Sequence, residues 1–322
     1  MSLATLGDLA LESGEAILDY QQSYVTHGTL NADRSNAILV CASLTGNHRR
    51  LDFLIGPGRA LDPARYFIVA TDAIGNGLST SPSNSARQPG VRFPRFALRD
   101  MVAAQYRLLT EHLRISGLHA IAGASMGGMQ ALQWAVSHPG FARGLVAMTP
   151  MARTTQWSAL VVATARACLT ADPAWTGDEF TRRPDRGWRA YAGLMDALLT
   201  RTPAAGDVDF EACVAAVETQ GFDAHDYLYQ SWAYEAHDVG TTPGFNGDTR
   251  RALASIKARA LLLAPPLDLF NPESAAREAA AAIPGARFVE IPSVRGHQAA
   301  TREGADEAAF LNRVVGEFLR EW

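Results

Sequence analysis

The chain has 322 residues, of which 48% are hydrophobic and 19% are charged, a balance that excludes a disordered protein. Lysine and arginine number 29 against 33 acidic residues, a net charge of −4, and no basic tract stands out. Nucleic acid is therefore not expected as a partner. The longest apolar runs fall far short of the roughly 20 residues of a membrane helix, so we expect no membrane-spanning segment.

The cysteines and the first residues predict a cytoplasmic protein. Cys41, Cys168 and Cys213 are widely spaced and form no C-x-x-C pair, which disfavours a disulfide scaffold or a zinc ribbon. Residues 1–15 lack the basic and apolar regions of a signal peptide. We also find no H-E-x-x-H, no dinucleotide-binding glycine motif and no Walker A sequence, so neither a metal nor a bound cofactor is expected.

Short apolar runs of strand length recur along the chain. They are Ala16 to Thr26, Ala37 to Ala42, Tyr66 to Thr71, Leu118 to Ala122, Gly144 to Thr149, Ala258 to Ala264 and Arg287 to Ile291. Helical patterns lie between several of them, at Phe96 to Leu113, Met126 to Ser137 and Pro272 to Ile283, and another follows at Ala305 to Trp322. This alternation predicts an α/β fold, with a mostly parallel central sheet covered by helices on both faces.

The alternation stops at Pro150. From there the chain has helical patterns separated by proline or glycine, namely Trp157 to Leu169, Asp185 to Arg201, Asp207 to Thr219 and Ala224 to Ala236. We therefore predict one interrupted domain. Residues 1–150 form the first part of the core, residues 151–251 form an inserted helical cap, and residues 252–322 form the second part of the core.

The strongest motif is Gly123-Ala-Ser-Met-Gly127, a G-x-S-x-G pattern between a predicted strand and a predicted helix. In that context Ser125 is expected on a sharp strand-to-helix turn, as in the α/β-hydrolase fold. Glycine on either side allows the close backbone approach that a Cβ atom would block. We predict that Ser125 is a nucleophile.

A serine hydroxyl requires a base, and in this fold the acid and then the histidine follow the serine along the chain. His297 follows the last predicted strand and is the best of eight histidines. Asp268 follows the strand that ends at Ala264 and would hold the tautomer of His297. Asp238 is the reserve candidate for the acid. For Asp72 a role in a turn or cap is favoured over catalysis.

The tetrahedral intermediate of acyl transfer needs two hydrogen-bond donors. One is expected from the backbone N–H of Met126, at the start of the helix after Ser125. The second should come from the loop after the strand Ala37 to Ala42, and we assign it to the backbone N–H of Leu44.

These segments resemble homoserine O-acetyltransferases and their α/β-hydrolase relatives. The similarity rests on Gly123-Ala-Ser-Met-Gly-Gly-Met-Gln-Ala-Leu-Gln-Trp134, Ser43-Leu-Thr-Gly46, Asp172-Pro-Ala-Trp-Thr-Gly177, Phe222-Asp-Ala-His-Asp-Tyr227 and Ile256-Lys-Ala-Arg259. It implies the same triad of Ser125, Asp268 and His297 and a ping-pong mechanism through an acyl-enzyme. It also implies a homodimer that pairs through the cap.

Two departures from the family pattern bear on the acceptor. The acetyltransferases usually carry Gly-His-Asp at the histidine, where this chain has Gln298, and the arginine and tyrosine positions of the cap are altered around Arg189 and Arg201. An amino acid acceptor needs opposed charges at fixed positions. The leading hypothesis is therefore hydrolysis of a small ester, amide or thioester.

The alternatives are an O-acetyltransferase that uses acyl-CoA as co-substrate, with homoserine or another alcohol as acceptor, and a non-catalytic ligand receptor. We predict that the partner is a small-molecule acyl substrate in each enzymatic case. The candidate substrate contacts are Thr45, Asn76, Arg201, Tyr227 and Gln298.

Overall fold

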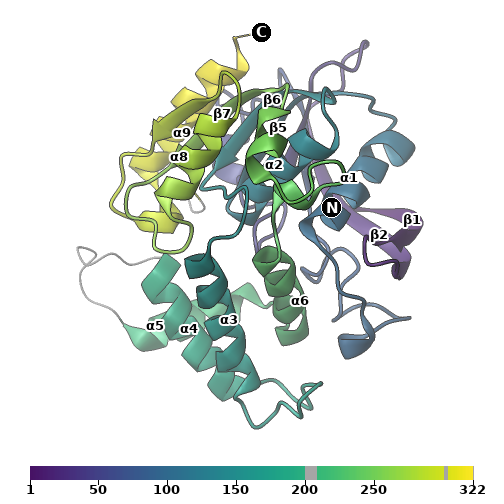
Figure 1. Cartoon of the computed structure of the whole chain (residues 1–322), viewed down its shortest axis with the longest axis vertical. Helices are drawn as coiled ribbons and strands as arrows, with labels where there is room; N and C mark the ends of the chain where they lie inside the picture. Colours follow the sequence, from purple (N-terminus) through teal and green to yellow (C-terminus); the bar gives the residue numbers. More distant parts are fainter. Residues whose placement is uncertain (200–208, 301–303, 322) are drawn as a thin grey trace.

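The computed structural model describes residues 1–199, 209–300 and 304–321. Their backbone forms an eight-stranded sheet of order β1-β2-β4-β3-β5-β6-β7-β8 (Figure 1). The β1–β2 and β2–β4 pairs are antiparallel, and the pairs from β4–β3 through β7–β8 are parallel. The strands are β1 Ser2–Ala10, β2 Ala16–His27, β3 Ala37–Cys41, β4 Phe67–Thr71, β5 Leu118–Ala124, β6 Ala142–Met148, β7 Arg259–Ala264 and β8 Arg287–Glu290.

Side chains alternate between the two faces of the sheet, and each face has its own hydrophobic cluster. Ile38 and Val40 pack with residues of α9 (Ala305–Leu319), whereas Leu39 and Cys41 belong to the cluster that contains α1 (Leu98–Arg107), α2 (Met126–Ser137) and α8 (Glu273–Ala282). The central parallel strands β3 and β5 are buried on both faces, which explains their continuous apolar sequences.

Of the described helices that lie between β6 and β7 in the chain, α3 to α6 gather at one end of the molecule (Figure 1). They are α3 Gln156–Thr170, α4 Asp185–Leu199, α5 Phe210–Gln220 and α6 Ala224–Glu235. Side-chain oxygens of Thr155, Asp209 and Asp223 cap α3, α5 and α6 by accepting first-turn N–H groups. Helix α3 packs against α4 and α6, and α4 packs against α5. We call the described part of residues 151–251 the helical segment.

The observed elements differ from the predicted ones at a few places. Strand β1 was not predicted from the sequence. The short helix α7, Thr249–Ala254, was not predicted either, and the predicted boundary after residue 251 falls within it. The predicted helix Phe96 to Leu113 begins at Leu98 and continues beyond α1 as a single π-helical stretch, Leu108–His112. The α/β fold with a mostly parallel sheet is confirmed.

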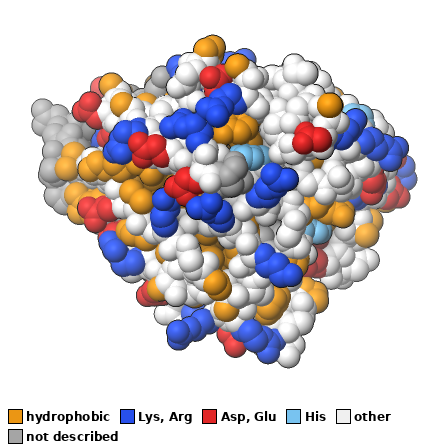
Figure 2. Space-filling model, turned by 90° about the horizontal axis from the view of Figure 1, so that it is seen from above, with side chains coloured by type: hydrophobic (Ala, Val, Ile, Leu, Met, Phe, Trp, Pro, Cys, Tyr) orange, Lys and Arg blue, Asp and Glu red, His pale blue; other side chains and the backbone are white. Residues whose placement is uncertain are grey.

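Figure 2 shows the end of the molecule away from α3 to α6. Basic side chains are interspersed with acidic ones there. Two of the basic side chains at the strand starts, Arg259 and Arg287, both pair with Glu321. Among the described helices, none has the length and apolar character required to cross a membrane.

Candidate active site

Ser125 stands between β5 and α2 in a strained backbone conformation, with φ 58° and ψ −125°. The turn is possible because the residues two positions before and after Ser125 are glycines, which have no side chain. A Cβ atom on Gly123 would lie 2.2 Å from the carbonyl carbon of Gly127, and one on Gly127 would lie 2.4 Å from the carbonyl oxygen of Cys41. The two glycines of the motif therefore let α2 start directly against the ends of β3 and β5.

Ser125, His297 and Asp268 form a continuous chain of hydrogen bonds. The Oγ atom of Ser125 lies 2.9 Å from Nε2 of His297, and Nδ1 of His297 lies 2.7 Å from Oδ2 of Asp268. All three residues are buried. The histidine is thereby oriented with one ring nitrogen on the hydroxyl and the other on the carboxylate, which is the geometry of a serine nucleophile with its base.

The acid is fixed by its own loop. Oδ1 of Asp268 accepts the N–H groups of Phe270 and Asn271, both at 2.8 Å. The Asn271 side chain donates to the carbonyl oxygen of Thr149 at 2.7 Å, which ties this loop to the end of β6. The ring of Phe270 packs edge-on against His297. Oδ2 is therefore left to face the histidine in a fixed position.

The loop after β3 carries the predicted second donor in a tight turn. The N–H of Gly46 donates to the carbonyl oxygen of Ser43 at 3.0 Å, and Thr45 adopts a positive φ of 55°. The Ser43 hydroxyl anchors the turn by donating to the carbonyl oxygen of Ala124, next to Ser125, at 2.9 Å. Leu44 lies inside this turn and lines the cavity beside Ser125. We call residues 43–46 the oxyanion turn.

A cavity of about 70 Å³ opens beside Ser125 and His297. Its core side is formed by Leu44, Thr45, Arg50, Phe270 and Gln298, and its opposite wall is apolar for the most part. That wall comes from α4 and α5 and includes Tyr191, Ala192, Met195, Leu199, Ala216 and Val217, together with Asp196 and Cys213. Burial, together with the nearby Tyr227, raises the pKa of the Tyr191 hydroxyl well above its usual value, so that hydroxyl is neutral.

The predicted substrate contacts divide into three groups. Thr45 and Gln298 line the cavity, as expected for residues next to Leu44 and His297. Asn76 and Tyr227 are not part of its lining: the Asn76 amide bonds within the loops of the core, and the Tyr227 ring is fully buried against Tyr191. Arg201 lies outside the described residues.

Several residues at the site were missed by the sequence analysis. Arg50 lines the cavity, although it sits beyond the end of the family-like segment Ser43 to Gly46. Gln230 of α6 accepts the Thr45 N–H at 2.9 Å and donates to the carbonyl oxygen of Ile74 at 2.9 Å. Asn271 had a weak signal, three residues after Asp268, whereas Gln230 had none because its partners are distant in sequence.

No cluster of metal-ligating side chains occurs within residues 1–199, 209–300 and 304–321. Asp238, the reserve acid, instead accepts the Gly240 N–H and the Thr249 hydroxyl, both at 2.7 Å, and takes no part in the triad.

Comparison with known proteins identifies the family. A family model described as alpha/beta hydrolase fold matches residues 36–178. Homoserine O-acetyltransferase of Methanosalsum zhilinae is 32% identical over 97% of this chain and 71% of its own length. This chain belongs to the homoserine O-acetyltransferase-like family of α/β-hydrolases.

The family includes hydrolases with similar resemblance to this chain. Ethyl acetate hydrolase of Pseudomonas veronii is 32% identical over 92% of this chain and 88% of its own length. The crystal structure of an acetylester hydrolase from Corynebacterium glutamicum superposes with a TM-score of 0.93 at 28% identity, over 99% of this chain and 96% of that one. The protein is therefore an enzyme of acyl transfer, a serine hydrolase or an O-acyltransferase.

Proposed function

We propose that the protein hydrolyses esters of short carboxylic acids, acetyl esters above all, through an acyl-enzyme on Ser125. The observation that carries this proposal is the small cavity directly beside the hydrogen-bonded Ser125–His297–Asp268 triad. A cavity of about 70 Å³ is roughly half the volume of an engineered cavity that takes a benzene ring. An acetyl group fits such a space.

The triad supplies both halves of the reaction. His297 Nε2 takes the Ser125 proton as Oγ attacks the ester carbonyl, and the N–H groups of Leu44 and Met126 are proposed to stabilise the oxyanion. His297 then gives the proton to the leaving alcohol, which departs and leaves the acyl-enzyme. Water attacks the acyl-enzyme with His297 again as the base, and the carboxylic acid leaves as the Ser125 hydroxyl is restored.

Transfer to an alcohol is the second candidate, and one observation favours it. The cavity lining contains a cation, Arg50, and a carboxylate, Asp196, which is the pair of charges that an amino acid acceptor requires. Against this stands Gln298 beside the triad, where the acetyltransferases usually have an aspartate. An acyltransferase would take its acyl group from acyl-CoA as co-substrate and would need no other cofactor.

The deciding experiment is intact-protein mass spectrometry with acetyl-CoA and with p-nitrophenyl acetate as alternative donors. We expect a 42-dalton adduct from the ester, roughly the mass of an acetyl group less a proton, and its discharge by water at the same rate with or without homoserine. An adduct from acetyl-CoA that homoserine discharges faster than water does would establish the transferase. Absence of both adduct and turnover with either donor would favour the receptor hypothesis.

We further propose a cytoplasmic homodimer that pairs through the helical segment, acts on small acyl molecules and binds neither nucleic acid nor membranes. Exposed apolar side chains on that segment, Trp157 and Leu160 of α3 and Phe210 of α5, support this pairing because exposed apolar surface favours association. The mass of the particle in solution, measured by light scattering for the native chain and for a Leu160→Glu variant, tests it.

A further inference from the structure

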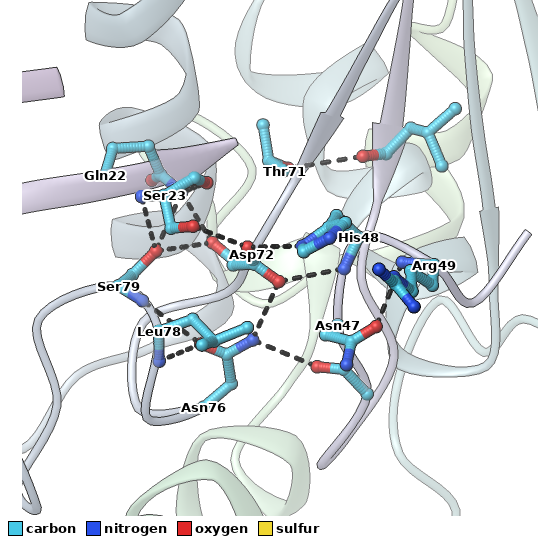
Figure 3. Close-up of polar contacts among 12 residues, drawn as sticks. Gln22, Ser23, Asn47, His48, Arg49, Thr71, Asp72, Asn76, Leu78 and Ser79 are labelled. Carbon is cyan, nitrogen blue, oxygen red and sulfur yellow. Dashed lines mark hydrogen bonds and ion pairs between the residues drawn. The ribbon is translucent and has the colours of Figure 1, made fainter. Parts of the chain in front are cut away.

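Asp72 follows β4 and is fully buried, yet it lies outside the lining of the cavity beside Ser125. Its carboxylate accepts hydrogen bonds from three residues (Figure 3). Oδ1 accepts the His48 N–H at 2.8 Å and the Asn76 amide at 3.2 Å, and Oδ2 lies 2.9 Å from Nδ1 of His48 and accepts the Ser23 hydroxyl at 2.7 Å. Two of these partners, His48 and Asn76, belong to the loops that surround the oxyanion turn.

The oxyanion turn is strained. Thr45 has a β-branched side chain and a φ of 55°, a conformation that residues other than glycine adopt only at an energetic cost. Such a conformation persists only where the surroundings enforce it. The turn carries the N–H of Leu44, so any relaxation of Thr45 would rotate the peptide next to that donor.

The buried network holds the C-terminal end of this turn. Asn76, which contacts Asp72, donates through the same amide to the carbonyl oxygen of Gly46 at 3.1 Å. His48 is bonded to Asp72 through both its backbone and its ring, which fixes the chain two residues after the turn. Gln230 of α6 fixes the Thr45 N–H itself.

We infer that Asp72 is a positioning residue that keeps the oxyanion turn in its active conformation through His48 and Asn76. The inference rests on the proposed function, because it assumes that the Leu44 N–H stabilises the oxyanion on Ser125. Asp72 acts by accepting hydrogen bonds and touches no substrate.

The test compares Asp72→Ala with Asp72→Asn. Alanine removes every acceptor, and we expect kcat to fall by about 10-fold to 100-fold, less than the 10²–10³ that loss of one whole donor costs. Asparagine keeps an oxygen for the His48 and Asn76 N–H groups, and its amide can donate to the His48 ring and the Ser23 hydroxyl, which can both accept. We therefore expect Asp72→Asn to retain more than a third of the native kcat.

The substrate is p-nitrophenyl acetate, and rates are taken per reactive serine, counted by the mass shift after saturation with a fluorophosphonate. KM should change less than twofold. Inhibition by ethylboronic acid, which forms a tetrahedral adduct on serine, should weaken in Asp72→Ala by the same factor as kcat/KM.

The matched control is Asp100→Ala, which removes another buried carboxylate that accepts two backbone N–H groups, those of Glu12 and Ala97. We expect that control to lower Tm and to leave kcat per site unchanged.

A second variant pair tests the strain directly and serves if Asp72→Ala does not fold. Asn76→Ala cuts the bond to Gly46 and should lower kcat, and Thr45→Gly added to either alanine variant should restore part of the loss, because glycine accepts the positive φ without strain. Native kcat in both alanine variants, an unchanged boronate affinity, or an equal loss in Asp72→Asn would overturn the inference. Activity that survives Ser125→Ala would instead overturn the proposed function, so the two failures are distinguishable.

Discussion

The carboxyl ends of the parallel strands, which we call the sheet edge, and the helical segment hold their parts of the site in different ways. At the sheet edge, Asp268 accepts two backbone N–H groups, Ser125 is flanked by two glycines that admit no side chain, and the oxyanion turn is bonded on both sides. On the helical side, the cavity wall is made of apolar side chains of α4 and α5, and the Arg189–Glu211 pair that joins these helices is largely exposed.

The difference separates two properties of the enzyme. Directional hydrogen bonds in a buried site fix atoms to the accuracy that bond making requires, whereas apolar packing fixes volume. We therefore expect the sheet edge to determine whether the reaction occurs and the helical segment to determine which acyl group reacts. Each of the following predictions can break or sharpen this division.

The largest effect is expected for Ser125→Ala. Turnover of p-nitrophenyl acetate should be lost, because no oxygen remains to form the acyl-enzyme, while Tm and the far-ultraviolet circular dichroism stay close to native. Substantial turnover by the purified variant would refute the role of Ser125 and with it the assignment of chemistry to the sheet edge.

Asp268→Asn should lower kcat by about 10⁴-fold. The amide cannot accept the Nδ1–H of His297 in the same way, so the ring no longer presents Nε2 as an acceptor to Ser125. Steady-state kinetics measures the loss, and Asp238→Asn is the control, because Asp238 bonds to Gly240 and Thr249 instead. A comparable loss in the control variant would reopen the choice of acid.

Met195→Ala should change selectivity while sparing the chemistry. Met195 lines the cavity from α4, and its truncation provides space for a longer acyl chain. Because each buried CH₂ contributes about 0.8 kcal/mol, the ratio of kcat/KM for the butanoate ester to that for the acetate ester should rise by about tenfold. Met101→Ala, a truncation at a buried position of α1, should destabilise the fold without altering that ratio.

The smallest effect concerns Asp226, which links α6 to the core by accepting the N–H and the hydroxyl of Ser83. Burial raises its pKa to about 7, and the neighbouring Asp223 acts in the same direction. The folded protein therefore holds this proton more tightly than the unfolded chain does, so this group's contribution to stability declines as pH rises from about 4 to about 7.

Asp226→Asn removes that titration. The Tm of the variant minus the Tm of the native chain should be larger at pH 8 than at pH 5 by roughly a few °C. Calorimetry of both proteins at constant ionic strength measures this difference. Parallel curves for the two proteins across this range would contradict the raised pKa.

The sequence predicted the parts of the fold that have strong local patterns. Helix α2 has the predicted bounds, and strands β3 to β8 differ from their predicted runs by one or two residues at one or both ends. Strand β1 was missed because its apolar residues are irregularly spaced: the register shifts around Gly7, which breaks the alternation that marks a half-buried strand.

The candidate site was predictable where the chemistry has a fixed order along the chain. The hydrogen-bonded chain of Ser125, His297 and Asp268 follows from a motif and from the ends of two strands. Asn76 and Tyr227 lie outside the cavity lining, because topology brings their segments near the site without fixing where their side chains point. The support of the oxyanion turn by Gln230 joins residues 185 positions apart, and no local pattern records such a contact.

The place where the helical segment enters the sheet has a consequence for how such enzymes diversify. Strands β6 and β7 are parallel neighbours, with Met148 paired to Leu263, so the segment leaves and rejoins the sheet at adjacent strands. Sequence of another length can be spliced there at a small entropic cost, since closure of a loop becomes only slowly less favourable with length. The nucleophile and its base would keep their positions during such an exchange. The substrate specificity of such an enzyme can therefore change while its catalytic residues stay in place.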